Sequence, residues 1–323
     1  MAKKILGIDL GGTSVKMAII SSEGEILEKW TIATNILEDG SHIVPDMIQS
    51  IREHLDRYGL TTADFLGIGM GSPGKVDAHA GTVIGAYNLN WRTLQPVREA
   101  FQAAFDVPFF IDNDANVAAL GEQWKGAGNN ADDVVLFTLG TGVGGGIVTN
   151  GQLVRGFGGA AGEVGHITVD TENGFDCTCG KKGCLETVAS ATGIVNLARQ
   201  FAEEYVGDSP IKAAVDNGDV VTSKDIFEAS KAGDFFAEQV VERFAKYLGL
   251  AVAHIACTLN PSSIVLGGGV SAAGEYLLEQ IKPFYHAYTF PQIRENTQLA
   301  LATLGNDAGV IGAAQLVRLQ QGA

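Results

Sequence analysis

Short apolar runs alternate with amphipathic stretches along most of the chain, and this pattern predicts strands and helices in alternation. Residues 5–10 form an apolar run, a glycine-rich turn follows, and residues 15–20 form a second run. Because neither run has helical spacing, the segment is predicted to be a strand, a tight turn and a strand. Residues 25–33 can pair as a third strand, and residues 134–148 repeat the first unit about 130 residues later. We therefore expect a duplicated α/β architecture.

The other predicted elements follow from the same spacing. Apolar positions three and four residues apart predict helices over residues 43–58, 94–105, 117–125, 185–205, 235–258 and 308–319. Continuous apolar runs predict buried strands over residues 65–70, 107–111 and 263–266. We expect an N-terminal α/β domain over residues 1–115, a larger C-terminal α/β domain over residues 116–304, and a cleft between them. The last helix, within residues 305–323, can return to pack on the first domain.

Composition and charge narrow the classes of partner. The chain has 323 residues, 46% of them apolar, and its 22 basic and 37 acidic side chains give a net charge of −15. This excess repels phosphate backbones and anionic lipid head groups, so we expect neither a nucleic-acid nor a membrane partner. The longest apolar run, residues 248–259, is interrupted by His254 and is too short to span a bilayer. The N-terminus lacks the pattern of a secretory signal, and we expect a soluble, cytoplasmic protein.

Three glycine-rich turns each follow an apolar strand, at residues 11–13, 140–145 and 267–269. Such turns can present backbone N–H groups to phosphate oxygens, although any one of them alone could be a plain hairpin. The second turn contains G-x-G-x-x-G, but residues 146–148 continue as a strand where a dinucleotide-binding fold requires a helix. Asp9 ends the first strand, and a carboxylate beside a phosphate-binding turn can hold Mg²⁺ directly or through water.

A polar cluster lies between a predicted buried strand and a predicted helix. It consists of Asp112, Asn113, Asp114 and Asn116. The dipole at a helix N-terminus favours an ionised acid, so this cluster is either a functional acid site or a set of helix-capping residues.

One imidazole and three thiols have the spacing of a metal site. His166, Cys177, Cys179 and Cys184 form the pattern H-x10-C-x-C-x4-C, while Cys257 stands apart. Three thiolates and one imidazole suit tetrahedral zinc with no open position. Buried reduced cysteines near an unrelated histidine are the alternative.

Together these motifs resemble the sugar kinases of the actin, hexokinase and Hsp70 superfamily, and within it the ROK family (repressors, open reading frames and kinases). Residues 7–13 resemble the family's first phosphate motif, residues 139–146 its second, and residues 267–270 its adenosine-side motif. Residues 177–186 are similar to the family pattern C-x-C-G-x2-G-C-x-E. The resemblance covers nearly the whole chain. It implies the two-domain actin-like (ribonuclease H-like) ATPase fold.

The resemblance also implies an activity, that of an ATP-dependent hexose kinase most like the bacterial glucokinases of the family. Asp114 is then the general base for the 6-hydroxyl of glucose, with N-acetylmannosamine or fructose as alternative sugars. The implied sugar contacts are Gly74, Asn88, Asn113, Asp114, Glu163, His166 and Glu186. The implied positions for ATP and Mg²⁺ are Asp9, Gly11, Gly12, Thr13, Lys16, Gly140, Thr141, Gly142, Gly144, Gly267, Gly268 and Gly269. The zinc is implied to be structural, and Asp112 replaces the Glu of many relatives.

Two other functions are possible for this combination of motifs. A sugar-sensing repressor of the same family would carry a helix-turn-helix segment before the first strand, which begins here at Ile5. An actin-like or chaperone-like ATPase would not need the metal loop with its sugar-type acids. We expect a homodimer or a homotetramer.

Overall fold

The computed structural model describes residues 3–322, which divide into two compact units. Within this range, residues 3–132, 146–162 and 304–322 form the first unit, and residues 133–145 and 163–303 form the second. No helix in the described range is both long and apolar enough to cross a membrane.

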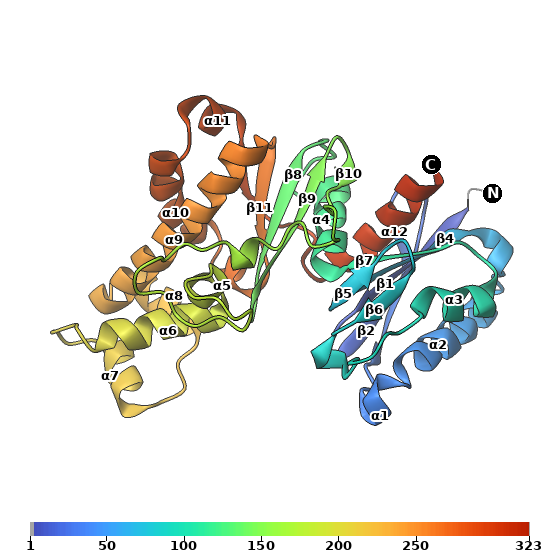
Figure 1. Cartoon of the computed structure of the whole chain (residues 1–323), viewed down its shortest axis with the longest axis horizontal. Coiled ribbons are helices and arrows are strands. Elements are labelled where there is room, and N and C mark those ends of the chain that lie inside the picture. Colours follow the sequence, from blue (N-terminus) through green and yellow to red (C-terminus); the bar gives the residue numbers. More distant parts are fainter. Residues whose placement is uncertain (1–2, 323) are drawn as a thin grey trace. The chain divides into compact units, whose positions relative to one another are not determined.

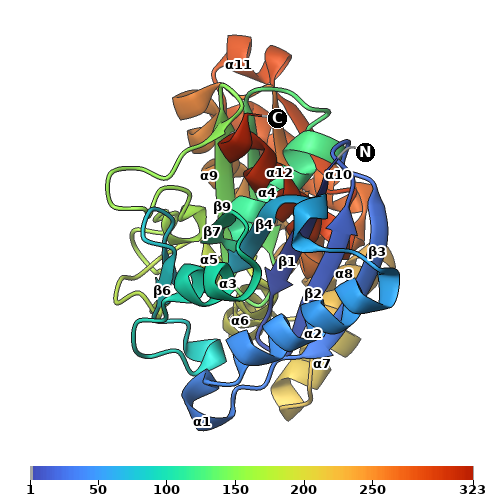
Figure 2. The ribbon, with the colours of Figure 1, turned by 90° about the vertical axis from the view of Figure 1, so that its right-hand side faces the viewer.

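The first unit is built on a five-stranded sheet in the order β3-β2-β1-β4-β7 (Figure 1; β3 is labelled in Figure 2). Its strands are β1 (Lys4–Leu10), β2 (Ser14–Ile20), β3 (Ile26–Ala33), β4 (Phe65–Ser72) and β7 (Phe109–Asn113). β1 pairs antiparallel with β2 and parallel with β4, and β4 pairs parallel with β7. The predicted sequence of strand, tight turn and strand at the N-terminus is therefore confirmed.

Alternate side chains of β1 point to opposite faces of the sheet, and helices α2 (Ile43–Tyr58) and α3 (Val97–Phe105) cover one of these faces. Leu6, Ile8 and Leu10 are buried in a core that includes the apolar faces of α2 and α3. Figure 2 shows α2 running across the strands on this side. The apolar side chains at every second position of β1 and those on one face of α2 thus pack in the same core.

The opposite face of the sheet carries α12 (Ala308–Gln321), which contacts β1 and β4. A Cβ atom at Gly69 would lie 1.9 Å from the carbonyl oxygen of Ala313, so glycine in β4 allows the helix backbone to approach the strand. The C-terminal helix is accordingly part of the first unit.

The predicted boundary after residue 115 differs from the observed division. Helix α4 (Asp114–Lys125), which that boundary gives to the larger domain, lies in the first unit and packs on α12. A Cβ atom at Gly312 would lie 1.7 Å from the carbonyl oxygen of Val117, a separation that only glycine permits. This close helix packing, which the apolar pattern does not reveal, holds α4 in the first unit.

A second five-stranded sheet has the order β10-β9-β8-β11-β12. Its strands are β8 (Val134–Leu139), β9 (Val143–Thr149), β10 (Gln152–Leu153), β11 (Ser263–Gly267) and β12 (Gln298–Leu301). β11 pairs parallel with both β8 and β12. As predicted, β8, a glycine-rich turn and β9 repeat the plan of β1 and β2.

The predicted helix over residues 185–205 is two helices. α5 (Glu186–Ala189) ends at Ser190, which has extended backbone angles, and the Ser190 hydroxyl accepts the Gly193 N–H to begin α6 (Ala191–Ala202). The remaining helices of the second unit are α7 (Pro210–Asn217), α8 (Ser223–Lys231), α9 (Phe235–Leu259), α10 (Glu275–Tyr288) and α11 (Pro291–Asn296). Of these, only α9 was predicted.

Short elements complete the chain. In the first unit they are α1 (Leu37–Gly40), β5 (Lys75–Asp77), β6 (Thr82–Ile84) and the 3₁₀ turns η1 (Thr62–Asp64), η2 (Tyr87–Leu89) and η5 (Gly305–Asp307). The second unit adds the 3₁₀ turns η3 (Val164–His166) and η4 (Gly269–Ala273).

Candidate active site

Asp9 lies near the end of β1, where its carboxylate faces the start of α12. A Cβ atom at Gly309 would lie 2.5 Å from Asp9 Cγ, so the glycine leaves room for the carboxylate. Lys16 Nζ, on the neighbouring strand β2, lies 3.3 Å from Asp9 Oδ2. The two side chains are 22% and 29% exposed. The structure therefore brings together two of the predicted nucleotide-side residues, with the carboxylate open to solvent or a cation.

The first glycine-rich turn, residues 11–13, is held by Thr34, which was not among the predicted residues. The Thr34 hydroxyl donates to the carbonyl oxygen of Gly11 at 2.7 Å, and the Thr34 N–H donates to that of Thr13 at 3.0 Å. Because Thr34 follows β3 and meets the turn only through sheet pairing, no local motif marks it.

Two predicted sugar-side residues lie in loops of the first unit. Gly74 has φ = 90°, and a Cβ atom there would lie 2.8 Å from the Ala86 side chain. Asn88 is exposed on η2, with its Nδ2 atom 3.2 Å from the position of a Cβ atom at Gly12. The structure therefore places Asn88 against the first turn.

Asp112 is buried at the end of β7, and both of its carboxylate oxygens are occupied. Oδ1 accepts hydrogen bonds from the Asn113 N–H and from Asn116 Nδ2, each at 2.9 Å. Oδ2 accepts from Arg155 Nε at 2.6 Å, and the Asp112 side chain is only 5% exposed. Asp112 thus fixes the strand end and has little capacity left for a substrate.

Asp114 is placed differently, as the partly exposed first residue of α4. Asn113 caps this helix, its Oδ1 accepting the Ala115 N–H at 2.9 Å, and Asp114 Oδ1 accepts the same N–H at 2.9 Å. The helix dipole therefore favours the ionised carboxylate. The helix begins at Asp114 rather than at the predicted residue 117, so the polar cluster spans the strand end and the first turn of the helix.

In the second unit, the second glycine-rich turn is tied to the helices that follow the cysteine cluster. The Ala191 N–H donates to the Gly140 carbonyl at 2.8 Å. The Val143 N–H donates to Glu186 Oε2 at 3.0 Å, and a Cβ atom at Gly142 would lie 2.4 Å from the same oxygen. Glu186, expected among the sugar contacts, therefore lies against a predicted phosphate-binding turn. Of the other predicted positions here, Thr141 is exposed and Gly144 lies in β9.

The third turn, residues 267–269, contacts the end of β8, the strand that precedes the second glycine-rich turn. Gly268 has φ = 84°, and a Cβ atom there would lie 2.5 Å from the carbonyl oxygen of Leu139. A cavity of about 110 Å³ lies between η4 and α8; its lining is Ser223, Lys224, Phe227, Glu228, Gly269, Val270, Ala272 and Ala273. Because α8 was not predicted, the α8 side of this cavity could not be found from the sequence.

The imidazole and the three cysteines predicted as metal ligands come together. The donor atoms of His166, Cys177, Cys179 and Cys184 all lie within 4.8 Å of one another. His166 Nδ1 is 3.6 Å from Cys177 Sγ, and Cys179 Sγ is 3.6 Å from Cys184 Sγ. Tetrahedral zinc with Zn–S bonds of about 2.3 Å and Zn–N bonds of about 2.0 Å needs donors about 3.5–3.8 Å apart. These two separations match such an ion, and the chemistry of the donor set suits zinc.

The thiols of the cluster shift one another's pKa values. Burial, followed by the hydrogen bonds and the charges of Cys179 and Cys177, raises the pKa of the Cys184 thiol to about 12. The Lys181 N–H, by its hydrogen bond, lowers the pKa of Cys179. A bound divalent cation removes the repulsion that opposes several thiolates in one place.

Two residues outside the cluster anchor the loop that carries it. Asp170 Oδ1 accepts the N–H groups of Glu172 and Asn173, at 3.1 and 3.0 Å. The Tyr247 hydroxyl, on α9, donates to Asp170 Oδ2 at 3.0 Å. Burial and then the hydrogen bond to Asp170 raise the pKa of Tyr247 to about 12, so this hydroxyl remains a donor at neutral pH.

His166 has its two ring nitrogens directed to different groups. Nδ1 faces Cys177, and Nε2 lies 3.9 Å from Glu163 Oε2. This geometry permits one nitrogen to bind a metal and the other to face a polar ligand.

The predicted residues form two groups, one in each unit. The group in the first unit contains Asp9, the first turn, Asn88 and the Asp112–Asp114 cluster. The group in the second unit contains the other two turns, the acids Glu163 and Glu186, and the cysteine cluster.

Comparison with known proteins identifies the family. The model of the ROK family matches residues 5–320. A glucokinase from Halalkalibacterium halodurans is 46% identical over 316 residues, which are 98% of this chain and 95% of the relative. A xylose repressor from Caldicellulosiruptor bescii is 31% identical over 97% of this chain and 77% of its own length. The crystal structure of a ROK family glucokinase from Streptomyces griseus in complex with glucose and AMPPNP has a TM-score of 0.75 and 34% identity, covering 98% of this chain and 99% of its own. The chain therefore belongs to the ROK family, as its motifs predicted, and has the two-domain actin-like ATPase fold of the family's sugar kinases.

Proposed function

We propose that this protein phosphorylates glucose, transferring the γ-phosphoryl group of ATP to the 6-hydroxyl and releasing ADP. The observation that carries this proposal is the 46% identity with a glucokinase over 98% of the chain. The two structural groups described above supply a carboxylate, phosphate-binding turns and a set of acids, which are the components that such a reaction requires.

Asp114 acts as the general base. Its carboxylate accepts the proton of the sugar 6-hydroxyl, whose oxygen attacks the γ-phosphorus while the bond from that phosphorus to the β–γ bridging oxygen breaks. Asp112 is unsuited to this role, because Arg155 and Asn116 already occupy its oxygens. Asp114 is partly exposed at the start of α4.

The nucleotide binds through the three glycine-rich turns. The first two turns present N–H groups to the phosphates, and Asp9 holds Mg²⁺ directly or through water. Mg²⁺ neutralises charge on the phosphoryl oxygens when it is bound. The adenosine end occupies the cavity beside Gly269 and Phe227, which adjoins the third turn.

Polar side chains expected from the resemblance supply the contacts to the sugar. Glu163, Glu186 and His166 Nε2 accept or donate hydrogen bonds to hydroxyl groups, and Asn113 retains its amide NH₂ as a donor because its Oδ1 caps α4. Zinc bound by His166 and the three cysteines is structural, since no ligand position is left open. It fixes the segment that carries these side chains.

We expect the Glu186→Ala variant to raise the KM for glucose about tenfold or more, because it loses a hydrogen bond between a sugar hydroxyl and a charged group. The KM for ATP should change less. The reason is that the Val143 N–H, which loses its carboxylate partner, remains available to a phosphate oxygen. Steady-state kinetics with each substrate varied in turn measures both constants. Glu186→Gln is the control, since its amide oxygen can still accept the Val143 N–H; a larger effect on ATP than on glucose would contradict the assignment.

An assay that follows ADP release tests the function itself. ADP should form only when glucose and Mg²⁺–ATP are both present, in equal amount to glucose 6-phosphate. ADP release that is independent of sugar would instead indicate an ATPase.

A further inference from the structure

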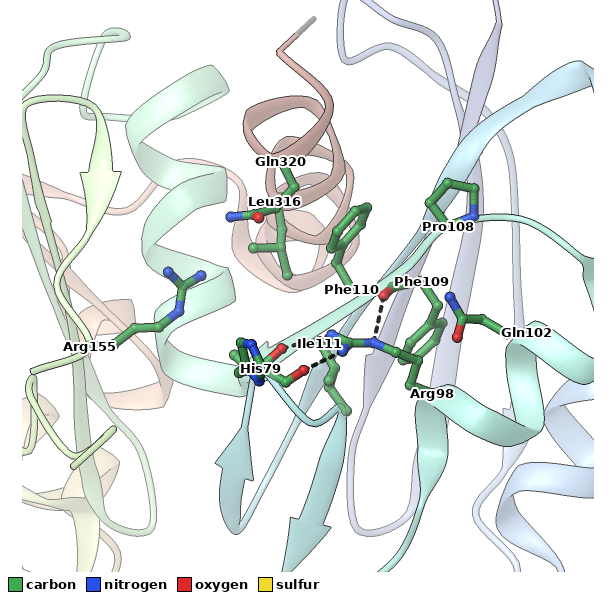
Figure 3. Close-up of a pocket in the computed structure, with 11 residues that line it drawn as sticks. His79, Arg98, Gln102, Pro108, Phe109, Phe110, Ile111, Arg155, Leu316 and Gln320 are labelled. Carbon is green, nitrogen blue, oxygen red and sulfur yellow. Dashed lines mark hydrogen bonds between the residues drawn. The ribbon is translucent and has the colours of Figure 1, made fainter. Parts of the chain in front are cut away.

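A hollow of about 530 Å³ lies within the first unit, and neither the nucleotide nor the sugar assignment uses it (Figure 3). It is lined by side chains of α3, of α12 and of β7, by the segment after β5, and by Arg155. Its volume is within the range of small-molecule sites, about 300–1,000 Å³. The hollow is therefore large enough for a metabolite.

Basic residue types line the hollow, although the chain as a whole has a net charge of −15. Arg98, Arg155 and His79 line it, and none of the described residues that line it is an Asp or Glu. The nearby Asp77 accepts the N–H groups of His79 and Ala80 at its Oδ1 atom, and its carboxylate also interacts electrostatically with His79 and Arg98. The lining thus departs from the acidic character of the chain, which favours an anionic ligand.

The charge of Arg98 is not cancelled by its hydrogen bonds. Nε donates to the carbonyl of Phe109 at 3.1 Å, Nη2 donates to that of Ala78 at 2.7 Å, and Nη1 donates to that of His79. All three acceptors are neutral, so they fix the guanidinium group in place without neutralising it. A fixed, charged guanidinium is preorganised for a phosphate or carboxylate.

Arg155 approaches the hollow from the side opposite Arg98, with His79 between them (Figure 3). Only its Nε is engaged by Asp112, and its side chain is 32% exposed. The terminal nitrogens of the guanidinium group therefore remain as donors to a ligand. Through Asp112, this same side chain is joined to Asn113 and Asn116, beside the proposed base.

The rest of the lining suits a carbon skeleton that carries hydroxyl groups. Phe110 and Leu316 supply apolar surface, and the amides of Gln102 and Gln320 supply donors and acceptors. We propose that this hollow binds a phosphate monoester of a small hydroxylated compound, with the phosphate between Arg98, His79 and Arg155. Resting on the proposed function, we further infer that this ligand alters catalysis through the Arg155–Asp112 pair.

Calorimetric titration with glycerol 3-phosphate tests the binding site, with inorganic phosphate and glycerol as partial ligands. The wild type should bind glycerol 3-phosphate more tightly than either partial ligand. His79→Glu and Gln320→Glu place a negative charge in the hollow at exposed positions, and each should weaken binding at least tenfold. Gln292→Glu, the same kind of change at an exposed position of α11, is the matched control and should bind as the wild type does.

Absence of binding, or binding that neither hollow variant weakens, would overturn the site. The second result would mean that the phosphate-binding turns are being titrated. Glucose phosphorylation by the same preparations separates the two proposals. Normal kinase activity without binding of glycerol 3-phosphate overturns only this inference, and binding without kinase activity overturns only the proposed function.

The regulatory link requires that glycerol 3-phosphate change kcat or KM at least twofold in the wild type and not in His79→Glu. Binding without this change would overturn the link.

Discussion

The Asp114→Asn variant should lose at least about 100-fold in kcat for glucose phosphorylation, the scale of general acid–base catalysis. Asparagine keeps the size and the hydrogen bond at the start of α4 but cannot accept the hydroxyl proton. Glucose affinity, measured by calorimetry, should change little, because the amide can still contact a hydroxyl group. The measurement is a comparison of kcat and of glucose binding between the variant and the wild type.

Asp112→Asn is the matched control, since it makes the same chemical change two residues away. It breaks the pair with Arg155, in which the Asp112 side chain is 5% exposed. We therefore expect a lower melting temperature, because a partly buried charge loses its partner, and a smaller loss of kcat in the folded fraction. Retention of most turnover by Asp114→Asn, with loss in Asp112→Asn, would move the base to Asp112.

Removal of zinc should have the second large effect. The Cys179→Ser variant is expected to lose the zinc ion that we propose for the cluster, and to fall in melting temperature and in activity, because metal binding and folding are coupled. Cys179 is exposed, so loss of packing contributes little to the change. Elemental analysis of protein purified without added metal, together with thermal unfolding, measures both effects.

Cys257→Ser is the control for this experiment. Cys257 is also exposed, but it lies outside the four-residue cluster, so its variant should keep the zinc and the melting temperature of the wild type. Full activity in zinc-free protein would contradict the structural role, and so would an equal effect of the two substitutions.

The parts of the fold that depend on local spacing were predictable from the sequence. The helix predicted over residues 43–58 is α2 (Ile43–Tyr58), and the turns after β1 and β8 lie where the glycines indicated. The cluster of His166 and the three cysteines was predictable for a similar reason, because three of its four residues lie within eight positions and glycines provide the turns between them. Local chemistry and short spacing carry this information.

What the sequence could not show depends on contacts between distant residues. The assignment of α4 to the first unit depends on backbone contact between Val117 and Gly312, nearly two hundred residues apart. The roles of Thr34, Asp170 and Arg155 likewise appear only when separate elements meet. Glu186 was found as a candidate, but its hydrogen bond to the second turn was not foreseen.

The specificity constant for glucose tests the central claim most directly. Initial rates with saturating Mg²⁺–ATP would be measured for glucose, mannose, fructose, N-acetylglucosamine and N-acetylmannosamine, with sugar phosphate and ADP both quantified. A site built to hydrogen-bond particular hydroxyls discriminates strongly against analogues that leave its buried groups unpaired. We predict the highest kcat/KM for glucose, with one ADP formed for each glucose 6-phosphate. A higher kcat/KM for another of these sugars would contradict the assignment of glucose, and the absence of any sugar phosphate would contradict the kinase itself.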